Sequence, residues 1–459
     1  MSISPPPEVQ AEVLGNETRR KPHTRHSNRR EASASGVASF DSMGMRIKKN
    51  ISQTQNSALP NQSLKSIELF AGAGGMALGV SQAGFAHQAV IEMDGDCCST
   101  MRANKNGSSS LTANWPVLKR NVCKLSYSPF GTDLDLLAGG PPCQPFSQGG
   151  KGGGHRDTRN MFPQAVRAVR ELRPKTFVFE NVNGLLRWAF TQYVDYLRLC
   201  FAYPDLLQSS KETWLGHHRR LERHHTSGAS ESYRIVIRSV NAANYGVPQS
   251  RERVIIVGVR SDLGLDWQFP TPSHSEAQLL GDQWITGTYW DKHAIPKKNR
   301  PLVPRELRDT IQRLRDYDSP GEPWQTVRDA IGDLSNPMET SRDQAAVANH
   351  LHIPGAKRYA GHTGSRFDWP AKALKAGDHG VPGGENMLAH ANGRVRYFTV
   401  RECARLQTFP DAYLFEGGWR STTRQLGNAV PVRLARIVAS SLERALMAKH
   451  SRRNSPRNG

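Results

Sequence analysis

Short apolar runs recur along the first half of the chain, each five to eight residues long and most rich in β-branched or aromatic residues. A run of this length that is bounded by glycine or polar residues is typical of a buried β-strand. Helix-compatible stretches lie between several of the runs, and in 161–174 apolar residues recur at helical spacing. Strands that alternate with helices predict an α/β protein with a mainly parallel sheet. The six predicted strands are 66–70, 87–93, 134–139, 176–181, 233–240 and 253–259.

The apolar pattern also divides the chain into regions. Residues 1–63 are rich in Ser, Asn, Pro and Arg, follow neither a strand nor a helix period, and are expected to be disordered. The pattern is lost again over 263–399, a region too long for a connecting loop, so we expect a second, smaller domain there. Amphipathic helices are predicted over 399–411 and 430–449, and a basic tail over 449–459 ends the chain.

The amino-acid composition indicates what kind of partner the protein binds and in which cellular compartment it works. The 61 Lys and Arg residues against 41 Asp and Glu give a formal charge of +20, which favours a polyanionic partner such as nucleic acid. No run of about 18 apolar residues and no secretory signal is present, so we expect neither a membrane span nor export. The six cysteines form no Cys-x-x-Cys pair, which favours a reduced cytoplasmic protein without structural zinc or another metal site.

The stretch SIELFAGAGGMALGV is typical of a strand, a glycine loop and the start of a helix. Gly72, Gly74 and Gly75 allow the backbone to approach a ligand where a Cβ atom would obstruct it. Glu92 follows Gly72 by twenty positions at the end of the next predicted strand, where a carboxylate can hold ribose hydroxyls. Ala77 replaces the last glycine of the dinucleotide fingerprint, which favours an adenosine-type cofactor without a pyrophosphate. The alternative is a plain tight turn followed by a surface glutamate.

A cysteine follows the predicted strand 134–139 in the stretch LLAGGPPCQPFS. Cys143 lies after the apolar run and between prolines, so it is expected in an exposed turn rather than in a core. A nucleophilic role requires a nearby positive charge or a proton acceptor, because a free thiol is mostly protonated at neutral pH. The alternative is a bystander thiol.

Two further groups mark strand ends. Glu180 closes the predicted strand 176–181, where a carboxyl group partly removed from water can act in proton transfer; the alternative is a salt bridge or cap. Arg251 and Arg253 lie two residues apart at a strand start, hence on one face, where guanidinium groups can hold a phosphate and a base carbonyl. The alternative is a solvated edge. Because the carboxyl ends of parallel strands share one crevice, these groups are expected to converge.

The ordered motifs FAGAGG, GGPPCQPFS, ENV, QSRER, RECARLQTFPD and QLGNAVP resemble those of the DNA cytosine-5 methyltransferases of the bacterial type II modification kind. The resemblance runs from about Ser66 to Ala448 in the unpermuted order and is interrupted by 263–399. It implies a Rossmann-like S-adenosylmethionine-dependent methyltransferase sheet with a smaller target-recognition domain. Residues 64–262 would form the first part of the catalytic domain, 263–399 the target-recognition domain, and 400–448 the return to the catalytic domain.

The resemblance also implies a role for each candidate residue. Cys143 would add to carbon 6 of a target cytosine that has been flipped out of the duplex. Glu180 would protonate or hydrogen-bond ring nitrogen 3, and Arg253, with Arg251 beside it, would hold the O2 oxygen. Residues implied in binding S-adenosylmethionine are Phe70, Gly72 and Gly74 for the methionine end, Glu92 for the ribose, Met93 and Asn121 for the adenine, and Pro142 and Asn428 for the same pocket. Asn121 stands where the family often has an aspartate, and the insert 187–232, with HHRRLERHH, is a second departure for which we favour a solvated helix over a DNA contact.

Three other functions fit the sequence less well. The incomplete glycine fingerprint and the basic charge argue against a nicotinamide oxidoreductase. A catalytically inactive DNA-binding relative is expected to lack Cys143 or Glu180. The Trp- and Arg-rich region 263–399 and the absence of a Cys-Phe-Thr signature at LCFAYPD argue against a tRNA-directed enzyme.

The expected partner is double-stranded DNA, and a restriction endonuclease acting on the same site is a candidate second partner. We expect a monomeric cytoplasmic enzyme associated with the nucleoid. Bases would be read in the major groove by side chains of 263–399.

Overall fold

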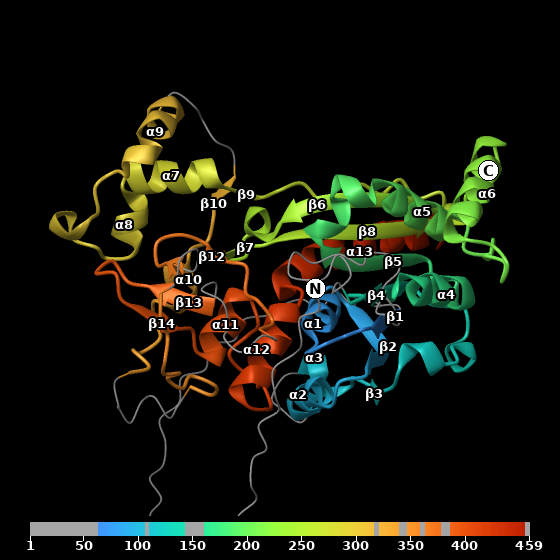
Figure 1. The fold of residues 1–459 in the computed structure, drawn as a ribbon, viewed down its shortest axis with the longest axis horizontal. Helices are drawn as coiled ribbons and strands as arrows, with labels where there is room; N and C mark the ends of the chain where they lie inside the picture. Colours follow the sequence, from blue (N-terminus) through green and yellow to red (C-terminus); the bar gives the residue numbers. More distant parts are fainter. Residues whose placement is uncertain are drawn as a thin grey trace, which may run out of the picture. The chain divides into compact units, whose positions relative to one another are not determined.

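A seven-stranded sheet forms the centre of the structure (Figure 1), a computed structural model that describes residues 63–105, 110–142, 160–315, 321–338, 347–358, 363–377 and 386–454. The strand order is β3-β2-β1-β4-β5-β8-β6. Strands β1, β2, β3, β4 and β5 run parallel to one another, and β8 runs antiparallel to both β5 and β6. The strands are β1 (Leu64–Leu69), β2 (Phe85–Glu92), β3 (Val117–Lys119), β4 (Leu136–Gly139), β5 (Thr176–Val182), β6 (Tyr233–Asn241) and β8 (Glu252–Arg260).

The predicted α/β fold class is confirmed, and all six predicted strands are present within about two residues of their expected ends. Strands β4 and β5 are almost entirely buried because helices cover both faces of the sheet. Alternate side chains of β5 enter different clusters, with Phe177 and Phe179 on one face and Val178 on the other. Helices α4 (Phe162–Leu172) and α5 (Thr191–Ala202) pack on the first face, and α1 (Gly75–Gln82) and α13 (Val432–Asn454) on the second.

The three predicted helices are also present. Helix α4 ends where Arg173 takes a left-handed conformation. Helix α11 (Val400–Leu406) begins with a capping box in which Thr399 and Glu402 exchange hydrogen bonds. It ends earlier than predicted, since Thr408 has a φ of 59° and a proline follows. Helices α2 (Gly95–Lys105), α3 (Ser110–Ala113) and α12 (Trp419–Asn428) complete this part of the chain. Among the described residues, no helix has the length and apolar character needed to cross a bilayer.

Residues of the region 263–399 belong to three hydrophobic clusters. A small cluster of Leu279, Tyr289 and Trp290 belongs to this region alone. Val327 and Leu374, by contrast, share a cluster with residues of α1 and α11. Trp267 is buried against the second face of the central sheet, so the first residues of the region pack with the sheet. The helices are α7 (Glu276–Trp284), α8 (Thr288–Lys292), α9 (Arg308–Leu314) and α10 (Val327–Ile331); the strands are β9 (His274–Ser275), β10 (Glu322–Pro323), β11 (Ser365–Arg366), β12 (Ala371–Lys372), β13 (Met387–Ala389) and β14 (Val395–Tyr397).

The insert 187–232 contains α5 and α6 (Trp214–Thr226), and one face of α6 is buried against α5. His217 and His218 are buried, and the His217 ring lies 3.0 Å from the Tyr196 hydroxyl. His218 Nε2 lies 3.0 Å from an Asp195 carboxylate oxygen, and with Glu222 these two residues offer three donor atoms within 4.8 Å of one another, a spacing a metal ion could bridge. The helix is therefore solvated on one side only.

Candidate active site

The glycine loop after β1 adopts a conformation that places its backbone against open space. Phe70, Gly72 and Gly74 have φ angles of 55°, 54° and 81°. A left-handed conformation costs a bulky residue such as Phe70 about 1–3 kcal/mol, and such residues cluster at ligand sites. Among the described residues, the chain neighbours aside, no atom lies within 4 Å of the point where a Cβ on Gly72 would stand, whereas a Cβ on Gly75 would lie 2.4 Å from the Val430 carbonyl oxygen. The loop is therefore packed on its helix side and open beside Gly72.

Glu92 holds this loop against the end of β2. Its Oε2 accepts a hydrogen bond from the Gly72 amide at 2.8 Å, and its Oε1 accepts from the amides of Met93 and Asp94 at 2.7 and 2.8 Å. The register pairs Leu69 with Ile91, so the ends of β1 and β2 meet at one sheet edge. The chain order reverses between β1 and β4, and this is where open α/β sheets bind ligands. Glu92 thus shapes the crevice as well as lining it.

The other residues predicted to bind the cofactor differ in their exposure to solvent. Phe70 is half-buried, whereas Met93, Asn428 and Pro142 are exposed. Asn121 is also exposed, and its Oδ1 accepts a hydrogen bond from the Cys123 amide at 2.9 Å as the cap of a short 3-10 helix. In this structure the Asn121 side chain therefore caps the short 3-10 helix that follows it.

Helix α12 fixes the segment that follows Glu92, a role the sequence did not reveal. Arg424 forms an ion pair with Asp94 at 2.9 Å, and Ser421 donates a hydrogen bond to Asp96. Both contacts join residues more than three hundred positions apart. The only signal in the sequence was that QLGNAVP directly follows Arg424.

Glu180 forms a close ion pair with Arg253. The Arg253 Nε lies 2.6 Å from Glu180 Oε1, and both side chains are largely buried. The pair forms because β5 and β8 are antiparallel neighbours, with Val182 opposite Arg253. The other carboxylate oxygen, Oε2, would lie 3.6 Å from a Cβ placed on Gly140. Glu180 therefore lies between the strand that carries Arg253 and the chain that leaves β4.

Asn181 holds the same departing chain. Its buried side-chain amide donates a hydrogen bond to the Pro141 carbonyl oxygen at 3.0 Å. Gly139 is required at the end of β4, since a Cβ there would lie 2.5 Å from the Leu69 carbonyl oxygen. Cys143, two residues after Pro141, lies outside the described residues.

Arg251 is placed differently from the prediction. The expectation of a shared face assumed one continuous strand, but β7 (Gln249–Ser250) ends and β8 begins on either side of Arg251. Its buried guanidinium donates to the carbonyl oxygens of Leu374, Gly427 and Ala429 at 3.0, 2.6 and 3.2 Å. Arg251 thus joins three chain segments, while Arg253 contacts Glu180.

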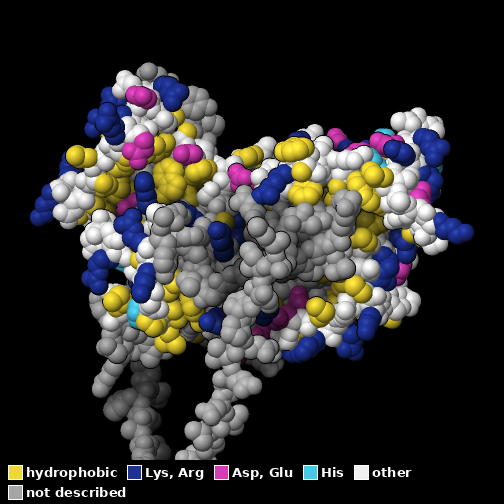
Figure 2. All heavy atoms as spheres, in the orientation of Figure 1, with side chains coloured by type: hydrophobic (Ala, Val, Ile, Leu, Met, Phe, Trp, Pro, Cys, Tyr) yellow, Lys and Arg dark blue, Asp and Glu magenta, His cyan; other side chains and the backbone are white. Residues whose placement is uncertain are grey.

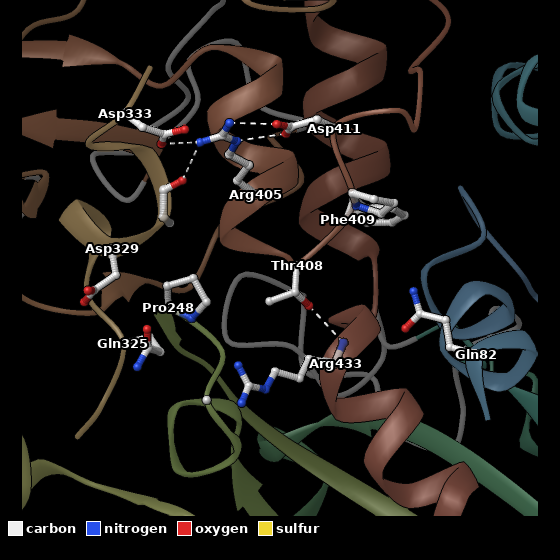
Figure 3. A pocket seen from close by; sticks show the side chains of 13 residues that line it. Gln82, Pro248, Gln325, Asp329, Asp333, Arg405, Thr408, Phe409, Asp411 and Arg433 are labelled. Atoms are coloured by element: carbon white, nitrogen blue, oxygen red, sulfur yellow. Dashed lines mark hydrogen bonds and ion pairs between the residues drawn. The ribbon is translucent and has the colours of Figure 1, made fainter. Parts of the chain in front are cut away.

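A separate open cavity of about 570 Å³ lies where α1, α10, α11 and α13 approach one another, and none of the predicted site residues lines it. Figure 3 shows Arg405 held between Asp411 and Asp333 on one side of this cavity. Arg433 extends from the start of α13 toward the loop that carries Pro248. Lysine and arginine side chains are spread over the described parts of the face seen in Figure 2, on both sides of the molecule.

The fold and the site define an α/β enzyme with a glycine loop at the switch point of its sheet and a buried acid–arginine pair at the same edge. A family model described as C-5 cytosine-specific DNA methylase matches residues 64–197 and 215–444. The chain belongs to this family and is a DNA cytosine-5 methyltransferase. The unmatched residues 198–214 fall within the insert 187–232 and run from the second half of α5 to the first residue of α6.

Curated relatives extend over most of the chain. The Type II methyltransferase M.Eco47II of Escherichia coli is 31% identical over 379 residues, which cover 82% of this chain and 78% of the relative. M.NgoMIV of Neisseria gonorrhoeae is 30% identical over 385 residues, covering 83% and 97%. Among solved structures, the Dnmt2 methyltransferase of S. pombe is 16% identical with a TM-score of 0.46, covering 84% of this chain and 99% of that one. The fold assignment rests on the strand order, not on this likeness.

Proposed function

We propose that this chain transfers a methyl group from S-adenosylmethionine to carbon 5 of a cytosine in a specific sequence of double-stranded DNA, through a covalent bond to Cys143. The observation that carries the proposal is the position of Glu180. One carboxylate oxygen contacts Arg253 and the other faces Gly140, three residues before Cys143. A carboxyl group and a guanidinium thus lie beside the chain that leads to Cys143, where we propose that a flipped-out base meets all three groups.

The chemistry requires each group in turn. The Cys143 thiolate adds to carbon 6 of the cytosine, and the electron pair displaced from the ring double bond makes carbon 5 nucleophilic. Glu180 protonates or hydrogen-bonds nitrogen 3, which stabilises the adduct, and Arg253 holds both Glu180 and the O2 oxygen. S-adenosylmethionine, when bound, supplies an electrophilic methyl group. Loss of the carbon 5 proton then expels the Cys143 thiolate and restores the aromatic ring.

The residues of the switch point fit S-adenosylmethionine. The space beside Gly72 is open, and its backbone conformation favours glycine. Glu92 uses its carboxylate on three amides, two at Oε1 and one at Oε2, so Oε2 keeps acceptor capacity for a ribose hydroxyl. Met93 is 63% exposed beside it and offers an apolar surface for an adenine ring. We propose that Phe70, Gly74 and Asn428 line the methionine side of the same pocket, with Pro142 next to the methyl group and Asn121 near the adenine.

The type II relatives support a modification enzyme that protects one DNA sequence, with a restriction endonuclease cutting the same sequence as its functional partner. We propose that residues of 263–399 read that sequence and that the enzyme acts as a monomer on the cytoplasmic nucleoid. The aromatic cluster around Trp290 gives this region a core of its own from which side chains can reach the major groove.

A duplex that contains 5-fluorocytosine tests the covalent step. Fluorine at carbon 5 cannot leave as a proton, so an adduct that has received the methyl group stays attached to the enzyme. We expect a complex that survives denaturing electrophoresis with the wild type and S-adenosylmethionine, and none with Cys143→Ser. Isothermal titration with S-adenosylmethionine serves as the folding control for the variant. An equal yield of trapped complex from Cys143→Ser would rule out the assigned nucleophile.

A further inference from the structure

Trp188 is the one exposed tryptophan of the chain. All nine tryptophans lie in the described residues, and the other eight are buried or half-buried. Trp188 is 90% exposed, and Leu186 close by is 37% exposed. A solvent-exposed indole is unusual because tryptophan is, on average, among the more deeply buried side chains. The uncovered indole therefore offers an aromatic face on which a flat group of a partner can stack.

The segment that carries Trp188 is firmly held, so its exposure is a property of the fold. It consists of two 3-10 turns, Asn183–Leu186 and Trp188–Phe190, between β5 and α5. Leu185 is fully buried in the core of the sheet, and Phe190 packs against the same core. The Phe190 amide donates to the Arg187 carbonyl oxygen at 2.8 Å. The turn is therefore anchored on both sides of Trp188, and the indole is directed away from the core.

The segment begins at the edge of the sheet where the proposed chemistry takes place. Strand β5 carries Glu180 and ends at Val182, directly before the first turn. Asn183 donates to Glu252, the neighbour of Arg253, at 2.7 Å and accepts from the Ser239 hydroxyl at 2.9 Å. These bonds tie the segment to the start of β8 and the end of β6. Trp188 thus projects from a support shared with the Glu180–Arg253 pair.

The chemistry of the segment matches DNA better than a protein partner. Arg187, next to Trp188, is exposed and has no ion pair among the described contacts, and the chain carries a net charge of +20. An arginine beside an aromatic ring is the combination that meets a phosphate with one side chain and a base face with the other. Apolar side chains that enter a base step also stabilise unstacked DNA.

We propose that Trp188 stacks on a base of the duplex that loses its neighbour when the target cytosine leaves the helix, while Arg187 contacts the adjacent phosphate. This role rests on the proposed function, because only an enzyme that extrudes its base creates such an unstacked face. Trp188 is then a positioning residue that holds the opened duplex over Glu180. It takes no part in bond making.

Affinity and its salt dependence separate stacking from a phosphate contact. Trp188→Ala should weaken binding to a duplex that carries the methylated sequence roughly 5- to 150-fold, with the salt slope unchanged. Trp188→Phe should retain most of the affinity because it keeps an aromatic face. Arg187→Ala should instead lower the salt slope by about one. Leu207→Ala, at a leucine that is 54% exposed in the segment between α5 and α6, is the matched control and should bind like the wild type.

Photocrosslinking makes the test specific to one residue. A duplex with 5-iodouracil beside the target cytosine should crosslink to the peptide that contains Trp188. The stacking role is overturned if the affinity of Trp188→Ala for the duplex is within twofold of the wild-type affinity, or if the substitution changes the salt slope. It is also overturned if the substitution lowers the melting temperature of the free protein, because the indole would then stabilise the fold. Methyl transfer by the wild type on the same duplex is measured first. An inactive wild type would contradict the proposed function, whereas an active one with an unaffected Trp188→Ala variant overturns the stacking role alone.

Discussion

Arg251→Ala distinguishes a structural arginine from a catalytic one. The sequence places Arg251 beside Arg253 at the substrate, but the structure gives its guanidinium to the carbonyl oxygens of Leu374, Gly427 and Ala429. The substitution removes these hydrogen bonds and leaves a buried space, since Arg251 is only 1% exposed. We therefore expect the variant to lose stability first and to lose activity only as a consequence.

The size of the loss follows from the bonds removed. A hydrogen bond from a charged donor contributes about 1.5–3 kcal/mol to stability, so three of them set an upper limit near 9 kcal/mol. Water that enters the vacated space restores part of the lost stability. The variant also no longer bears the free-energy cost of burying a guanidinium group. We expect a net loss of about 3–5 kcal/mol, in the range found when one partner of a buried charged pair is removed.

Urea unfolding and single-turnover methyl transfer together provide the assay. Arg251→Ala should shift the unfolding midpoint strongly, Arg251→Lys should restore part of the shift, and Arg238→Ala, at an exposed position on β6, should have little effect. At a temperature where Arg251→Ala stays folded, its rate of methyl transfer should approach that of the wild type. An unchanged unfolding midpoint combined with lost methyl transfer would show that Arg251 acts on the substrate.

Glu180→Gln keeps a neutral hydrogen-bonding group but supplies no proton, so the single-turnover rate should fall about 10²- to 10⁴-fold; a rate within about threefold of the wild type would remove the assigned role. Burial lowers the pKa of the His87 imidazole to about 4 from 6.5, so the folded protein holds this ring neutral. The contribution of the neutral ring to the free energy of unfolding is complete above pH 6.5 and is lost as the pH falls toward 4, because the unfolded chain binds the proton first. Unfolding measured from pH 7 to pH 4 should therefore show about 3 kcal/mol of lost stability that is missing in His87→Gln, and parallel curves would disprove this. Deleting residues 1–60 should weaken DNA binding mainly at low salt and leave the methylated sequence unchanged, as bisulfite sequencing would show, because that segment can contact phosphates but has no pattern for reading bases. Exchanging 263–399 for the same region of a relative should change the methylated sequence, and an active enzyme with its original specificity would contradict the assignment of base reading to that region.

The sheet could be predicted because most of its strands are buried on both faces. Burial on two sides turns β4 and β5 into continuous apolar runs, which stand out in any sequence. Strand β3 was missed because it has three residues and none of them is fully buried. The strands of 263–399 are two or three residues long, too short for any period to show. Length and burial thus decided which strands the sequence revealed.

The site was predictable where it depends on strand ends and was not where it depends on distant contacts. Glu92 and Glu180 each close an apolar run, so local pattern alone placed them at the sheet edge. The hydrogen bond from Asn181 to Pro141 joins residues 40 positions apart, and the ion pair of Arg424 with Asp94 spans far more of the chain. Arg251 was misplaced because a break between two strands has no signature in residue types. Tertiary packing, which local patterns do not encode, fixed these contacts.

Sequencing of methylated cytosines tests methyl transfer through Cys143 most directly. DNA is isolated from a host without cytosine-5 methylation of its own that expresses either the wild-type chain or Cys143→Ser. We expect 5-methylcytosine at one defined sequence in the DNA of the wild-type host and none in the DNA of the Cys143→Ser host. The absence of 5-methylcytosine with a folded wild-type protein would rule out the proposed methyl transfer, and the same mark in both hosts would rule out Cys143 as the nucleophile.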